Sequence, residues 1–275
     1  MAGKGNTMAN VWWPIISIFA IAGPIIVGCG SAPTVPGSEV RQVLAPTGTL
    51  RVGLSLGTAG QMLRDPASGE TKGVGYELGK ELARRLGVPF EPVILEGNAQ
   101  VLEALKSGRV DVASTNATPA RAKDMDFTQS YLEIEAGLLV PPGSSISSLA
   151  DADRAGIRIG VTKGSTSDVR ISQELKHATL VRASTLDNAI EMLASRQVDA
   201  FATNKTRLFA MSDRLPGFRV LDGRYAVEQI SIAIPKGRDL GLSFARRFVE
   251  DAKAEGLVVS AVERAGLRGT VKASK

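Results

Sequence analysis

Two patterns of apolar residues alternate along the chain. One consists of short stretches that are apolar throughout or alternate between apolar and polar residues, and the other of longer stretches in which apolar residues recur every three or four positions. The first pattern predicts β-strands and the second predicts amphipathic helices with one buried face. Strands are predicted at residues 50–55, 92–95, 110–113, 137–140, 157–161, 180–182, 198–202, 219–221 and 229–234. Helices are predicted at residues 73–86, 98–106, 148–154, 186–195, 205–212, 240–253 and 258–265, with shorter ones opening near 118 and 164. This alternation favours an α/β fold with mostly parallel sheets and helices on both faces.

Two stretches of the chain resemble each other without a gap. Residues 102–118 align with residues 190–206, and eight of the 17 positions are identical. In each copy a helix end runs into Val-Asp and a short apolar strand, which stops at Thr115-Asn116 or at Thr203-Asn204. Ligands of open α/β sheets bind beyond the carboxyl ends of the strands. The repeat therefore predicts two lobes that face one cleft, and chance similarity between two helix–strand units is the alternative.

The first 28 residues look like an export signal. Lys4 is the only charged residue before an uncharged run over residues 11–27, and Pro14 and Pro24 would weaken a permanent membrane helix there. The run leads into Ile-Val-Gly-Cys29, which resembles a bacterial lipobox. Cys29 is therefore predicted to carry lipid as the new N-terminus. An uncleaved anchor with an incidental cysteine, or a plain secretory signal, is the alternative.

Composition narrows the remaining function classes. Residues 29–48 are rich in Gly, Ser, Pro and Thr and are predicted to be a flexible tether. Cys29 is the only cysteine, so no disulfide within the chain and no second cysteine for metal or nucleophilic chemistry is expected. The net charge is +5 with basic and acidic residues interspersed, which argues against nucleic-acid binding. The lone His177 does not indicate a metal site. No metal and no cofactor is expected.

A series of motifs follows in a fixed order along residues 49–270. In the first half they are Leu50-Arg-Val-Gly53, Gly73-Val-Gly-Tyr-Glu-Leu-Gly-Lys-Glu-Leu-Ala83, Ser107-Gly-Arg-Val-Asp111, Thr118-Pro-Ala-Arg-Ala-Lys-Asp-Met-Asp-Phe-Thr128 and Ser130-Tyr131. In the second half they are Ser148-Leu-Ala-Asp151, Ile159-Gly-Val-Thr-Lys-Gly-Ser165 and Val198-Asp-Ala200. With these motifs the chain resembles the family 3 extracellular solute-binding proteins of bacterial ABC importers, many of which bind amino acids.

The resemblance implies a two-lobed periplasmic-binding-protein fold of type II. Two mostly parallel sheets with helices on both faces would be joined by two hinge strands. Residues 49–134 with 227–275 would form the first lobe, and residues 135–226 the second. The resemblance also implies a monomer in the periplasm or at the cell surface, held to the membrane by its lipid. It would deliver an anionic or zwitterionic solute to a cognate ABC permease.

The family motifs also imply an anion-holding set. Arg121 stands where the family's arginine grips a ligand carboxylate, and a planar guanidinium suits that role. Asn116 stands where members usually have Ser or Thr, and Ser114 is expected to offer a backbone group. Ser165 and Thr166 open a helix of the second lobe, whose first N–H groups attract anions. The alternative for the strand-end residues and for the helix opening is simple helix capping.

Two family features are missing. The aspartate that usually pairs with the ligand ammonium is Asn204 here, and an amide cannot neutralise a cation. The acid and the aromatic that usually follow the first strand are replaced by an uncharged stretch, in which Ser55 and Thr58 are the expected polar contacts. Glu228 is either a substitute carboxylate or a solvated surface residue. The sequence therefore predicts a small carboxylate or other anionic solute, not securely an ordinary α-amino acid.

Two other functions compete with solute binding. Some relatives, such as periplasmic cyclohexadienyl dehydratases, use the same cleft as an active site, and Glu228 or Glu77 would then be the acid or base. A sensor module would need a signalling domain, and the sequence up to Lys275 predicts none. A binding component of an importer that is not an enzyme is the leading hypothesis.

Overall fold

The computed structural model describes residues 36–56, 60–64 and 69–271. The predicted export signal, the lipidation site Cys29 and the expected contact Thr58 lie outside these residues. Within the described ranges, no helix is both long enough and apolar enough to cross a bilayer.

The expected tether is shorter than residues 29–48. Residues Ser38–Leu44 form helix α1, and its last side chain, Leu44, is fully buried. Leu44 packs against Gly241 of helix α8 (Asp239–Ala254), where even a Cβ atom would come within 2.7 Å of the leucine. This contact fixes the segment to the folded body, so the prediction of a flexible tether is wrong from residue 38 onward.

The described strands fall into two parallel groups. The first strand group consists of β1 (Leu50–Ser55), β4 (Phe90–Leu95) and β5 (Val112–Asn116). The second consists of β8 (Arg158–Thr162), β9 (Thr179–Ala183) and β10 (Ala200–Asn204). Within each group the carboxyl ends of the strands point the same way, and that is the edge where the sequence predicts a ligand.

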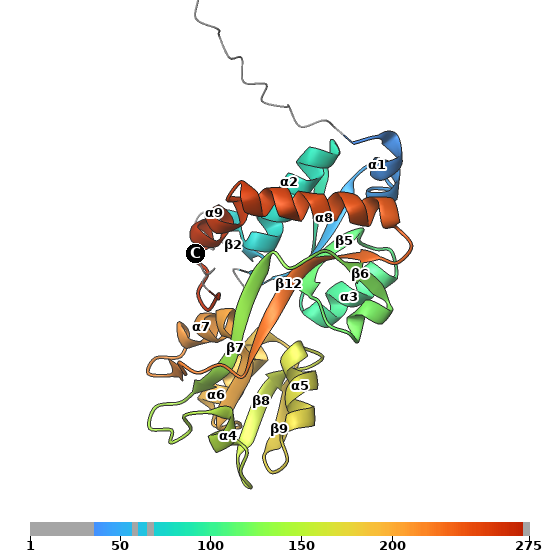
Figure 1. Ribbon diagram of the computed structural model, residues 1–275. Helices are drawn as coiled ribbons and strands as arrows, with labels where there is room; N and C mark the ends of the chain where they lie inside the picture. The colour runs from blue at the N-terminus through green and yellow to red at the C-terminus, as the bar shows by residue number, and fades with distance from the viewer. Residues whose placement is uncertain (1–35, 57–59, 65–68, 272–275) are drawn as a thin grey trace, which may run out of the picture. The chain divides into compact units, whose positions relative to one another are not determined.

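Two long strands connect the groups. They are β7 (Leu132–Val140) and β12 (Ala226–Pro235), which lie side by side in Figure 1 and pair antiparallel. Strand β12 also pairs with β5, and β7 also pairs with β10. The α/β fold and its crossing strands are therefore confirmed. The two expected sheets are joined into one hydrogen-bonded ladder, in the order β4-β1-β5-β12-β7-β10-β8-β9, because the crossing strands pair with each other.

Four short strands complete the described sheets. Strand β6 (Met125–Phe127) pairs with β12, and β11 (Arg219–Val220) pairs with β7. A separate pair is formed by β2 (Leu63–Arg64) and β3 (Thr71–Lys72).

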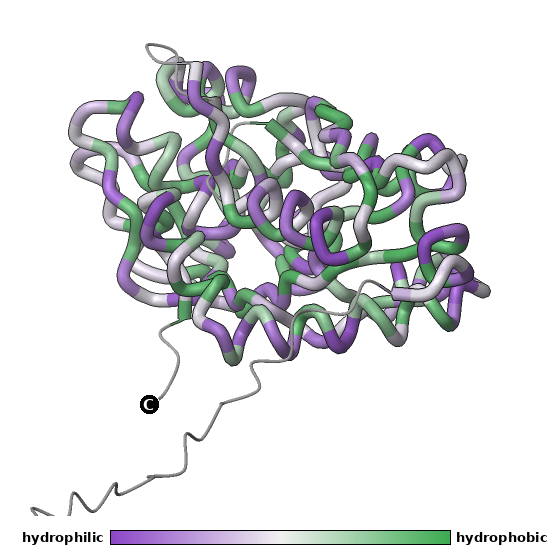
Figure 2. The backbone as a smooth tube through the Cα atoms, turned by 90° about the horizontal axis from the view of Figure 1, so that it is seen from above, coloured by the Kyte–Doolittle hydropathy of each residue, from purple (hydrophilic) through white to green (hydrophobic). Residues whose placement is uncertain are grey.

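Helices cover the sheet with one apolar face each. Those of the first group are α1, α2 (Val74–Leu86), α3 (Asn98–Lys106), α8 and α9 (Leu257–Arg264). Those of the second are α4 (Leu149–Ala152), α5 (Thr166–Glu174), α6 (Leu186–Ala194) and α7 (Lys205–Ser212). Helix α2 buries Leu78, Leu82 and Leu86, as their spacing predicts. Figure 2 shows hydrophilic and hydrophobic residues alternating along the helical turns, which is the pattern of helices packed on one side.

The sequence repeat has the same structural role in both strand groups. Asp111 accepts hydrogen bonds from the backbone N–H of Arg51 at 3.0 Å and from its Nε and Nη2 at 2.9 and 2.7 Å. Asp199 accepts the same three bonds from Arg158, at 2.8, 3.1 and 2.9 Å. The matching contact sets support a structural repeat rather than a chance similarity, and in both copies the strand ends at the Thr-Asn pair.

Candidate functional site

A cavity of about 340 Å³ lies among the strand ends of both groups. It is at the small end of the range of ligand pockets. The first group and its loops contribute Ser55, Gln61, Asn98, Thr115, Asn116 and Arg121. The second contributes Thr162, Lys163, Ser165, Thr166, Asn204 and Arg207, and the crossing strand β12 contributes Glu228. The structure therefore brings together eight of the sequence-predicted site residues: Ser55, Thr115, Asn116, Arg121, Ser165, Thr166, Asn204 and Glu228.

Arg121 is held by the end of β5 and the short turn that follows it. Its backbone N–H bonds the Thr118 hydroxyl at 3.3 Å. Its Nη1 donates to the Thr115 hydroxyl at 3.2 Å and to the Asn116 carbonyl at 2.9 Å. No acceptor of the described residues bonds its Nε or Nη2. Nη1 is thus anchored, while the Nε–Nη2 edge, which can bind a carboxylate bidentately, is left without a partner among the described residues on a side chain that lines the cavity.

Asn116 links the two strand groups directly. Its Oδ1 accepts from the backbone N–H of Gln229 on β12, and its Nδ2 donates across the cavity to the Thr166 hydroxyl, both at 3.0 Å. The side chain is almost fully buried. Asn116 and Thr166 were both predicted to contact the anion of the solute, and in the structure they bond each other.

The opening of α5 combines capping with open donors. The Ser165 hydroxyl caps the helix by accepting from the Asp168 N–H at 3.0 Å, as the capping alternative predicts. The Asp168 carboxylate accepts from the Gly164 N–H at 2.9 Å and pairs with Arg182. The first N–H groups of a helix have no partners within the helix, so the backbone N–H of Thr166 remains available to an anion.

Ser114 lies behind the cavity and does not line it. Its hydroxyl bonds the buried Tyr131 hydroxyl, and its carbonyl accepts from Gln61 Nε2 at 2.9 Å. Neighbouring residues of a strand point to opposite faces, so Ser114 faces the core while Thr115 faces the cavity. Gln61, which the sequence analysis missed, lines the cavity, and its buried Oε1 has no hydrogen-bond partner among the described residues.

Asn204 and Glu228 form a pair at the base of the site. Asn204 caps α7 by accepting from the Arg207 N–H at 3.0 Å, and its Nδ2 donates to Glu228 Oε2 at 3.3 Å. Glu228 is only 7% exposed, so it is not a solvated surface residue. Burial raises the pKa of Glu228, although the Asn204 hydrogen bond and the charges of Arg121 and Arg207 act in the opposite direction. A carboxylate therefore stands next to the position where the family has its aspartate.

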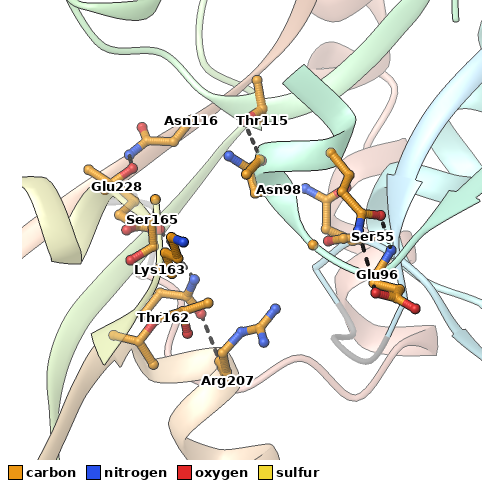
Figure 3. A pocket seen from close by; sticks show the side chains of 18 of the residues that line it. Ser55, Glu96, Asn98, Thr115, Asn116, Thr162, Lys163, Ser165, Arg207 and Glu228 are labelled. Carbon is orange, nitrogen blue, oxygen red and sulfur yellow. Dashed lines mark hydrogen bonds between the residues drawn. The ribbon is translucent and has the colours of Figure 1, made fainter. Parts of the chain in front are cut away.

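Arg207 is a cavity residue that sequence reasoning missed. It lies in the first turn of α7, and Figure 3 shows its side chain reaching from the helix toward the centre of the cavity. Burial lowers the pKa of the Arg207 guanidinium, and the charge of Glu228 raises it. No described residue forms an ion pair or a hydrogen bond with this guanidinium. The sequence signal that could have identified Arg207 is its position three residues after Asn204, which ends the strand and caps the helix.

Glu77, the other candidate acid or base, lies away from the cavity. It is on α2, where it pairs with Arg264 of α9 at the surface. Because Glu77 does not line the cavity, its candidate role as the acid or base of an active site there is wrong. Among the described residues, no group of His, Cys, Asp and Glu side chains is arranged to hold a metal ion.

Comparison with known proteins agrees with this architecture. The sequence profile of bacterial extracellular solute-binding proteins, family 3, matches residues 50–256. The ABC transporter glutamine-binding protein GlnH of Bacillus subtilis (strain 168) is 26% identical over 252 residues, which cover 88% of this chain and 91% of that protein. The L-arginine-binding protein of Pseudomonas aeruginosa is 28% identical over 200 residues, covering 68% of this chain and 76% of that one.

Solved structures share the fold. The ancestral amino acid-binding protein AncCDT-1, described as a precursor of cyclohexadienyl dehydratase, superposes with a TM-score of 0.71 and is 25% identical. The match covers 82% of this chain and 99% of that one. With the profile match over most of the folded body, this shows that the chain belongs to the bacterial extracellular solute-binding proteins of family 3.

Proposed function

We propose that this protein is the substrate-binding component of an ABC importer and that it captures a small carboxylate-bearing solute. Residues 49–134 with 227–275 act as one lobe and residues 135–226 as the other. Lipidated Cys29 holds the protein, as a monomer, to a membrane in the periplasm or at the cell surface. The solute passes from the cavity to a cognate permease.

One observation carries the proposal. Arg121 lines a cavity that both strand groups line, and it is anchored through Nη1, so its Nε–Nη2 edge has no partner among the described residues. A guanidinium edge without an internal partner matches the geometry of a carboxylate. The opposite wall offers the start of α5, whose N–H groups suit the same anion. Contact with both walls would reward closure only when solute is present.

A binding role fits better than catalysis. The aligned relatives are named as binding proteins, and AncCDT-1 is itself described as an amino acid-binding protein. With Glu77 outside the cavity, Glu228 is the one remaining candidate acid or base of the two that the sequence suggested. The names of the relatives include a neutral and a cationic amino acid, so they leave open the side chain of the solute.

The proposal is tested by thermal unfolding of the purified protein against matched solutes. Each L-amino acid is paired with its α-carboxamide and with its deaminated acid. A solute at 100 times its dissociation constant adds about 2.7 kcal/mol of stability and raises the melting temperature. We expect at least one carboxylate to do so while its carboxamide does not. Equal shifts by acid and carboxamide, or no shift with any carboxylate, would refute the proposal.

A further inference from the structure

The cavity lining holds two half-buried guanidinium groups and one buried carboxylate that are not ion-paired with one another. Lys163 and Glu96 also line the cavity, but both are exposed and their charges are of opposite sign. Arg121 comes from the first strand group, Arg207 from the second, and Glu228 from the crossing strand. Glu228 lies close enough to shift the pKa of both arginines. Among the residues that the structure describes, its carboxylate accepts a hydrogen bond from the amide of Asn204 only. With Glu228 ionised, the three groups carry a net charge of +1, since two cations face one anion.

The two arginines differ from two other cations with little exposure, Lys205 and Arg51. Lys205, close to Arg207 in α7, is 6% exposed; Glu135 neutralises it at 2.7 Å, and it donates a hydrogen bond to the Asp222 carbonyl. Arg51 is neutralised by Asp111. A charge withdrawn from water needs a partner of opposite sign, and the protein supplies one at both of these positions. Among the described residues, Arg121 and Arg207 form no ion pair and share only the nearby charge of Glu228, which indicates that the solute supplies their direct partners.

The charges define a complementary solute. Two carboxylates would pair with the two guanidinium groups, and one ammonium would pair with Glu228, giving the solute a net charge of −1. A neutral amino acid would leave one arginine unpaired, and a cationic one would bring a third positive charge beside Arg207. A dicarboxylic acid without an ammonium would leave Glu228 without a cationic partner.

Gln61 offers a second indication that the solute carries an ammonium. Its Nε2 is committed to the carbonyl and hydroxyl of Ser114, at 2.9 and 3.2 Å, which fixes the orientation of the amide. The opposite atom, Oε1, is a buried acceptor without a donor among the described residues. Buried polar atoms in native proteins normally have partners, so an N–H donor of the solute is the expected one. The cavity volume of about 340 Å³ restricts the solute to the size of a small metabolite.

We propose that the cavity selects a dicarboxylic α-amino acid the size of aspartate or glutamate, with Arg207 binding the second carboxylate. The inference rests on the proposed function, because Arg121 must hold the first carboxylate. Glu228 then replaces the missing aspartate as the partner of the ammonium, and Asn204 orients it. The specificity of this family member would thus be decided by residues on α7 and on the crossing strand.

The test is isothermal titration of the purified protein with L-glutamate, L-aspartate and their amides, L-glutamine and L-asparagine. In the wild type we expect at least one acid to bind about tenfold or more tightly than its amide, since each charged hydrogen bond contributes on that scale. Arg207→Gln should remove this preference, weakening the acid and leaving the amide within about threefold. Arg214→Gln, which removes an exposed arginine paired with Asp187, is the matched control and should keep the preference.

The outcomes separate the inference from the function on which it rests. Amides that bind as tightly as the acids would overturn the inference, and so would an Arg207→Gln variant that weakens acid and amide equally. If glutamine binds, requires Arg121 and ignores Arg207, the inference fails while the proposed function stands. If no carboxylate binds, both fail. Melting temperatures of the variants without solute show whether each remains folded.

Discussion

Replacing Arg121 by methionine is expected to weaken binding of a carboxylate solute by about a hundredfold or more, the largest effect of any single substitution in the cavity. The Nε–Nη2 edge can make two charge-assisted bonds to a carboxylate, each contributing about 1.5–3 kcal/mol. Every 1.4 kcal/mol corresponds to about tenfold in affinity. Isothermal titration with the solute that raises the melting temperature most provides the measurement.

Two further variants make this result specific. Arg121→Lys keeps the charge but loses the planar fork, so its affinity should lie between those of the wild type and of Arg121→Met. Arg109→Met removes an exposed arginine in the loop before β5 and should leave affinity unchanged. The account of the anion site is wrong if Arg121→Met binds with wild-type affinity while its melting temperature shows that it is folded.

Removing Asp111 is expected to destabilise the protein more than any change in the cavity. The carboxylate is fully buried and holds Arg51 through three hydrogen bonds, so Asp111→Ala leaves a guanidinium and a backbone N–H without their partner. Breaking one side of a buried pair costs about 3–5 kcal/mol. Chemical denaturation of the wild type and the variant measures the difference in the free energy of unfolding.

The repeat offers a matched control for this prediction. Asp199 makes the same contacts with Arg158, but its side chain is 31% exposed and that of Arg158 is 43% exposed. Water can therefore solvate the groups left behind, and Asp199→Ala should cost only about 1–2 kcal/mol. A loss from Asp199→Ala as large as that from Asp111→Ala would contradict the argument that burial sets the difference.

Much of the fold follows from periodicity, because burial of one face imposes it on the sequence. The leucines of α2 show this directly. The strand ends were predicted less well. The apolar run predicts a strand over 110–113, whereas β5 spans Val112–Asn116, because Ser114, Thr115 and Asn116 pair with β12. Polar residues that extend a strand by pairing with a segment far away in the sequence do not produce an apolar pattern, so the sequence does not indicate them.

Two predictions of local secondary structure were wrong because tertiary contacts determine the structure of those segments. The helix expected to open near 118 is only a single 3-10 turn, Arg121–Lys123, which positions the arginine at the cavity. Helix α1 was missed because its polar, proline-flanked sequence resembles a linker. It is held by burial of Leu44 against α8, a contact between segments far apart in the chain.

Site residues that belong to a sequence motif or to the repeat could be predicted. Residues that reach the cavity only because of the direction of a helix or the face of a strand could not. Arg121 follows from a motif, and the Thr-Asn pairs follow from the repeat. Arg207 belongs to neither, and its importance depends on the direction in which α7 leaves the sheet. For Glu228 the sequence left burial and exposure open, because a glutamate on a crossing strand can face either side, and here it faces the cavity.

A crystal structure of the protein grown with L-glutamate or L-aspartate, whichever binds more tightly, tests the central claim most directly. We expect the amino acid in the cavity between the strand groups, with its α-carboxylate on Arg121 Nε and Nη2 at about 2.7–2.9 Å. We also expect the ammonium at Glu228 and the second carboxylate at Arg207. A cavity that holds neither amino acid, or a bound one whose carboxylates lie away from Arg121, would contradict the claim.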